Sequence, residues 1–101
     1  MNNIIDFYFV KEQKHTDSMG QTVSTKQYEI CIGKMKSIFE REFYQASQAG
    51  IRPEFCIETP FVNYNGETLI TYEGKEYSIY RTFRVGTDKI ELYCQEKVGN
   101  N

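Results

Sequence analysis

The sequence predicts a mainly β fold of about six strands, with one α-helix inserted after the second strand. Short stretches in which apolar and polar residues alternate recur along most of the chain, and one stretch has helical spacing. The length of 101 residues fits a single domain with one modest core. Because a rolled sheet limits the exposed edges of many short strands, we expect residues 1–101 to form one small β-barrel with one helix.

The first strand is predicted from Ile5, Phe7 and Phe9, which alternate with other side chains in the period of a half-buried strand. Residues 11–26 are nearly all polar and are interpreted as a long hairpin connection. The residues Asp17-Ser18-Met19-Gly20 supply the turn chemistry, with Gly20 free to adopt positive φ. Connections of this length are usually functional or disordered.

The second strand shows Tyr28, Ile30 and Ile32 on one face. The apolar phase then slips by one residue to Met35, on the far side of Gly33. A slip of this kind next to a glycine indicates a β-bulge, so we expect the strand to bend at Gly33.

The helix is predicted to start at Ile38, because Ser37 precedes Glu40 by the three-residue spacing of a capping box. Within the predicted helix, residues 38–49, one apolar stripe is expected to pack on the sheet. The stripe consists of Phe39, Phe43 and Ala46. Gly50 and Pro53 follow as stop signals.

Four further strands are expected after the helix. The first alternates Phe55, Ile57 and Thr59 with polar residues and Cys56. A tight hairpin then joins residues 69–72 to residues 75–84 through Glu73-Gly74. The last strand, with Ile90, Leu92 and Cys94, follows a Gly86-Thr87-Asp88 link and completes a meander.

The composition argues against several functional classes. A net charge of −2 gives no basic stripe for displacing counterions from nucleic acid. The start lacks the pattern of a signal peptide, and no apolar run approaches the length of a membrane span, so no membrane association is expected. Cys31, Cys56 and Cys94 form no CxxC pair and are interpreted as free, buried thiols in a reducing cytoplasm.

No catalytic pattern stands out. The single histidine, His15, lies in the polar stretch without a cysteine or carboxylate partner at metal-ligand spacing. Phosphate-binding loops, the HExxH zinc motif and the GxSxG nucleophile elbow do not occur. We therefore expect no enzyme activity, no cofactor and no metal, and interpret the chain as a binding protein with many outward tyrosines.

Several segments, in order, resemble the head-closure, or head–tail adaptor, family of tailed bacteriophages, in versions from phages and prophages of Gram-positive bacteria. The segments are Asp17–Gln21, Lys36–Ala46 followed by Gln48–Glu54, Tyr72–Ile79, Tyr80–Thr82 and Ile90–Cys94. Each segment alone is weak evidence. The resemblance covers nearly the whole chain.

The resemblance implies a structural virion protein, assembled in the bacterial cytoplasm, that forms a dodecameric ring in the head–tail connector. The ring would close the DNA-filled capsid and provide the surface for tail attachment. Its implied partners are a portal-proximal adaptor, a tail terminator or tail protein, other copies of the chain, and DNA passing through the channel without sequence recognition. Ring contacts are expected at Asp17, Met19, Gly20 and Gln21 in the polar stretch, and at Glu40, Arg41 and Gln45 on the helix.

Two other functions remain open at this point. One is a different non-enzymatic protein-binding module, such as a tail chaperone or a regulator. The other is a single-stranded nucleic-acid binder that stacks bases on its tyrosines, which would bind oligonucleotides in a salt-sensitive way.

Overall fold

The computed structural model describes residues 3–97, which form six strands and one α-helix. The elements in order are β1 Ile4–Thr16, β2 Thr22–Lys36, α1 Glu40–Gln48, β3 Pro53–Pro60, the 3-10 turn η1 Phe61–Asn63, β4 Leu69–Tyr72, β5 Lys75–Val85 and β6 Lys89–Glu96. The strands make one antiparallel sheet in the order β1-β2-β3-β6-β5-β4, and β4 pairs back with β1. The prediction of a mainly β chain with one helix after the second strand is confirmed, and the sheet closes in a ring.

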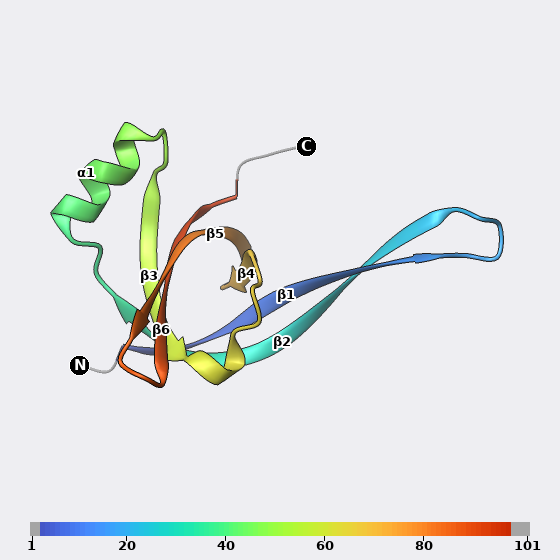
Figure 1. Cartoon of the computed structure of the whole chain (residues 1–101), viewed down its shortest axis with the longest axis horizontal. Coiled ribbons are helices and arrows are strands. Elements are labelled where there is room, and N and C mark those ends of the chain that lie inside the picture. Colours follow the sequence, from blue (N-terminus) through green and yellow to red (C-terminus); the bar gives the residue numbers. More distant parts are fainter. Residues whose placement is uncertain (1–2, 98–101) are drawn as a thin grey trace.

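Two short seams close the sheet. At one seam β1 pairs with β4 only through Tyr8↔Thr71 and Phe9↔Ile70. At the other, β2 pairs with β3 only through residues 34–36. Residues 11–16 of β1 and 22–27 of β2 have each other as their only ladder partners, and with the turn between them they project from the ring as a two-stranded arm, residues 11–27 (Figure 1).

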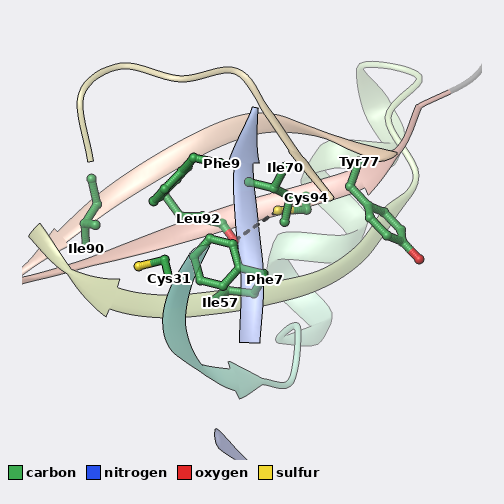
Figure 2. Packing of buried hydrophobic residues seen from close by; sticks show 9 residues of the cluster. All are labelled: Phe7, Phe9, Cys31, Ile57, Ile70, Tyr77, Ile90, Leu92 and Cys94. Carbon is green, nitrogen blue, oxygen red and sulfur yellow. Dashed lines mark hydrogen bonds between the residues drawn. The ribbon is translucent and has the colours of Figure 1, made fainter. Parts of the chain in front are cut away.

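The core fills the inside of the closed sheet (Figure 2). Phe7 and Phe9 from β1 pack edge to face, with ring centroids 5.1 Å apart, and both are fully buried. Ile57, Ile70 and Leu92, from β3, β4 and β6, are likewise fully buried. The alternating patterns predicted for the first, third and last strands are therefore confirmed as core-facing sets.

The bulge predicted at Gly33 is wrong. The β1–β2 register runs without a shift from Ile4↔Lys34 to Thr16↔Thr22. Tyr28, Ile30 and Ile32 lie on the outer face and are exposed, whereas Cys31, Gly33 and Met35 share the inner face. Gly33 is needed for a close approach instead: a Cβ built on it would lie 2.5 Å from Ile57 Cγ2 and 3.0 Å from Phe7 Cε1.

The long polar connection predicted for residues 11–26 is also wrong, because both strands continue through it and leave only residues 17–21 as the turn. The turn itself follows the prediction. The Asp17 carboxylate accepts hydrogen bonds from the backbone N–H groups of Met19 and Gln21, both at 2.9 Å, and Gly20 has a φ of 81°. The hairpin at Glu73-Gly74 and the closing meander are confirmed.

The helix is shorter than predicted and begins at Glu40, after an N-cap residue, Phe39, that makes no side-chain capping bond. The capping box expected from Ser37 and Glu40 is therefore wrong. Its C-terminal stop is confirmed: Gly50 has a φ of 80°, and the N–H groups of Gly50 and Ile51 bond to the carbonyls of Ser47 and Ala46. Only Ala46 of the predicted packing stripe is buried.

Gly33→Ala tests the close approach at the seam. We expect the variant to lose about 1–3 kcal/mol of unfolding free energy, because the added methyl group must displace Ile57 or Phe7 in a packed core. Urea denaturation measures the loss. The matched control is Lys34→Ala at the next, exposed position, which should stay within about 0.5 kcal/mol of wild type; equal stability of both variants would contradict the packing described.

Candidate functional site

The closed sheet is filled by its own side chains, so the surfaces available for function lie on its outside. Among residues 3–97, no group of three or more His, Cys, Asp and Glu side chains is placed to hold a metal ion. In the same part of the chain, no helix has the length and apolar character needed to cross a membrane.

The three cysteines are free and buried, as predicted. Burial raises the pKa of the Cys56 thiol to about 12, and burial also raises the pKa of Cys94. Cys31 contacts the Thr59 hydroxyl at 3.2 Å and accepts a weak bond from the Asn63 amide at 3.4 Å. Cys56 and Cys94 therefore remain protonated thiols at neutral pH, which suits packing better than nucleophilic chemistry.

The first set of predicted contact residues lies at the tip of the arm. Asp17 organises the turn, and Met19 extends from it with 80% of its surface exposed. Gly20 and Gln21 are also exposed. Below the tip both faces of the ribbon are polar and open to solvent, with His15 among the exposed residues.

The second predicted set lies on α1, where Glu40, Arg41 and Gln45 are all exposed. α1 and the arm tip stand at opposite ends of the molecule along its longest axis (Figure 1). Since the long axis extends over 51 Å, the structure does not bring the two predicted sets together. Any ring contact made by both sets would involve different neighbours or different parts of one neighbour.

A polar anchor ties α1 to the outside of the sheet. Glu42 accepts a hydrogen bond from the Tyr80 hydroxyl at 2.9 Å and pairs with the Arg81 guanidinium at 2.6 Å, both on β5. Arg81 in turn stacks over the ring of Tyr93 on β6, 4.1 Å from its centroid. Burial, and next the bond to Glu42, raise the pKa of Tyr80, so its hydroxyl remains a donor at neutral pH.

The aromatic residues of the helix are not held by this anchor. Phe39, Phe43 and Tyr44 expose 77%, 49% and 66% of their surfaces; we call these three residues the α1 face. The sequence had placed Phe39 and Phe43 against the sheet, and that prediction is wrong. The polar anchor holds the helix in a position where its large apolar side chains face outward.

Sequence reasoning missed a second exposed apolar surface, which we call the seam groove. It lies where β2 leaves β3 next to η1, and has a volume of about 650 Å³. Its apolar lining includes Ile30, Ile32 and Pro60. Ile30 and Ile32 are 60% and 59% exposed, which is unusual for neighbouring isoleucines on one face. The out-of-phase apolar residues on the second strand were the available signal, but they had been interpreted as a bulge.

Charged groups surround the groove. Lys34, Lys89 and Asp6 line it, and none of them forms an ion pair with another residue in the range 3–97. Glu58 also lines the groove, but it belongs to a paired cluster: its carboxylate lies 3.5 Å from Lys36, which lies 2.7 Å from Glu91. The groove therefore combines an apolar floor with unpaired charges of both signs.

The paired cluster stabilises the outer face of β3 and β6. Burial opposes ionisation of Glu91, but hydrogen bonds from Lys36 and from the Tyr93 hydroxyl, each 2.7 Å long, outweigh it and hold the pKa of Glu91 below its usual value. The bond to Glu91 likewise raises the pKa of Lys36.

No protein-family model matches the sequence, and no curated protein matches it in a similarity search.

Glu42→Ala tests the anchor of α1. Loss of the bonds to Arg81 and Tyr80 should let the helix open more often. Amide hydrogen exchange in residues 40–50 should therefore accelerate by roughly fivefold, equivalent to about 1 kcal/mol, while exchange in β6 is unchanged. Exchange mass spectrometry measures both segments. Glu40→Ala, in the same turn but outside the anchor, is the control and should have a much smaller effect.

The Glu91 cluster predicts a specific pH dependence. Because the folded-state pKa of Glu91 is lowered, its ionised carboxylate adds to the free energy of unfolding above the ordinary pKa of 4.5. This stabilisation is lost as the pH falls through the folded-state pKa. Glu91→Gln should cost about 1 kcal/mol at pH 7 and much less near pH 3. Urea titrations at both pH values, with Glu54→Gln as an exposed control, measure the difference; a cost independent of pH would contradict this account.

Proposed function

We propose that this chain is a structural subunit of the head–tail connector of a tailed phage or prophage, where it assembles into a ring that closes the DNA-filled capsid and receives the tail. In this proposal the closed sheet is a small β-barrel that acts as a rigid scaffold. The observation that carries the proposal is the presence of two exposed apolar surfaces, the α1 face and the seam groove, on different sides of one small scaffold.

Surfaces of this kind favour assembly. The α1 face presents three aromatic side chains and the seam groove two isoleucines, all at least 49% exposed. Contiguous exposed apolar patches larger than roughly a few hundred Å² are rare on monomeric soluble proteins and commonly mark interaction sites. A ring subunit needs two different surfaces, one for each neighbour, and needs no catalytic group.

The arm also supports an assembly role. In the backbone ladder, residues 11–16 and 22–27 pair only with each other, and almost all of their side chains are solvent-exposed. At the base of the arm, Lys11 and Lys26 form ion pairs with Glu67 and Glu76. A two-stranded ribbon without a third strand or a packed face is at most marginally stable in water. Contact with a neighbouring subunit or with a connector partner would supply the missing support.

The sequence resemblance gives the proposal its biological setting, including the dodecameric ring, the portal-proximal adaptor and tail terminator as partners, and the location in the virion. The arm tip, with Asp17, Met19, Gly20 and Gln21, and the helix residues Glu40, Arg41 and Gln45 are proposed as contact residues. DNA in the channel would pass these surfaces without specific binding, as the net charge of −2 favours.

The charge distribution disfavours the alternative of a single-stranded nucleic-acid binder. Most lysines near the sheet are already neutralised by carboxylates. These pairs are Lys11–Glu29, Lys26–Glu76, Lys36–Glu91, Lys75–Glu96 and Lys97–Glu76. Phosphate binding would have to compete with each of these pairs.

Deletion of the gene from an inducible prophage that encodes it tests the proposal. We expect induced cells to yield heads that lose their DNA and carry no tails, together with free tails, because the connector cannot be completed. Electron microscopy of the lysate and plaque counts measure the outcome, and expression of the gene from a plasmid is the control and should restore infectivity. Normal infectious virions from the deletion strain would contradict the proposal.

A further inference from the structure

We propose that the α1 face of one copy of this chain docks into the seam groove of a neighbouring copy. This head-to-tail contact deepens the proposed ring function and rests on it for its biological role. It identifies the occupant of both exposed apolar surfaces as a second copy of the same chain.

The two surfaces complement each other in chemistry. Phe43 and Tyr44 are adjacent in α1, Phe39 is the N-cap residue that immediately precedes the helix, and all three side chains are exposed. The open groove of about 650 Å³ offers an aliphatic floor, with Ile30 and Ile32 at its β2 side. Aromatic anchors that enter an aliphatic pocket are the typical energetic centre of a protein–protein interface.

Within one copy, the α1 face does not reach the seam groove. Glu42 ties α1 to Arg81 and Tyr80 on β5, whereas the groove lies at β2 and η1. The Lys36–Glu58–Glu91 cluster, whose Glu58 lines the groove, continues from it over the outer face of β2, β3 and β6. When the α1 face of each copy enters the groove of the next copy, the contact is heterologous, and it closes into a ring or continues as a filament.

The charged residues beside the two surfaces also have opposite signs in the proposed contact. Glu40 and Arg41 flank the α1 face, and neither forms an ion pair within residues 3–97. The groove offers Lys34 and Lys89 for Glu40, and Asp6 for Arg41. Glu40 and Arg41 thus each have a groove residue of opposite sign in the proposed contact, which would select this docking over others.

The surface area that the contact would bury indicates its strength. With about 150–250 Å² for each aromatic side chain, the exposed fractions of the α1 face amount to on the order of 400 Å². An interface that buries a similar area on the groove side remains below the roughly 1,200 Å² total of a stable complex. A single contact is therefore weak, and a closed ring, in which every copy makes two such contacts, would be formed cooperatively.

Cross-linking between two single-cysteine additions tests the contact in the full chain. Ile32→Cys in the groove is mixed with Phe43→Cys on the helix, at concentrations above about 100 μM where a weak contact is populated, and treated with a short bismaleimide. We expect the mixture to give roughly tenfold more covalent dimer than either variant alone, because the contact is heterologous. One variant carries ¹⁵N so that mass spectrometry identifies the mixed product.

The controls address reactivity and folding. Wild type gives the background from Cys31, Cys56 and Cys94, which are buried. Both new cysteines replace exposed side chains, and Ile30→Cys with Phe39→Cys provides a second, independent pair that should behave in the same way. Circular dichroism confirms that each variant is folded before mixing.

Two results would overturn the contact: no excess of mixed dimer with either pair, or as much dimer from Ile32→Cys alone, which would show groove against groove. If the contact fails while gene deletion gives tailless heads, the ring function stands and its interface lies elsewhere. If the mixed dimer forms while deletion leaves virions normal, the self-contact stands and the connector function fails.

Discussion

The close approach of β2 to the core at Gly33 underlies the architecture of this chain. Gly33 lies against Ile57 and Phe7 at the point where β2 meets β3, and a side chain there would push the strands apart. The seam beside it contains only three residue pairs, and the opposite seam between β1 and β4 only two. Closure therefore depends on packing inside the ring as much as on the backbone ladder, with Phe7 and Phe9 as the largest fully buried side chains.

Closure also determines where function can lie. Once the inner face is filled, each strand has only its outer face to offer, and the strands that outrun the ring become an arm. Polar bonds organise that outer face: Glu42 positions the helix, and the Lys36–Glu91 pair covers the neighbouring strands. The apolar residues left outside these bonds, on the helix and in the seam groove, are the ones that remain for partners.

Much of the fold could be predicted because the relevant signals are local. The alternation around Phe7 and Phe9, the turn chemistry of Asp17 and the helix stop at Gly50 all depend on residues close together in the chain. The errors came from long-range packing. The residues next to Gly33 in the sequence do not indicate that Ile57 fills the space where a side chain at position 33 would lie. Likewise, the residues next to Phe43 do not indicate that Glu42 binds the sheet in place of the aromatic side chain.

The candidate site was predicted less completely, for the same reason. The polar turn and helix residues could be selected as exposed, but the seam groove is assembled from β1, β2, β3 and η1 and has no local signature. Ile30 and Ile32 resemble core residues in the sequence because strand periodicity does not reveal which face is inside. The proposed role in a phage connector came from several sequence segments that resemble, in the same order, segments of one protein family.

The most direct test of the central claim is the number of copies of this chain in purified virions. Quantitative mass spectrometry with isotope-labelled peptides, calibrated against the portal protein, would measure it. We expect one ring of subunits per particle, in a fixed ratio to the portal subunits. Absence of the chain from particles, or a copy number as high as that of a capsid or tail-tube protein, would contradict the central claim.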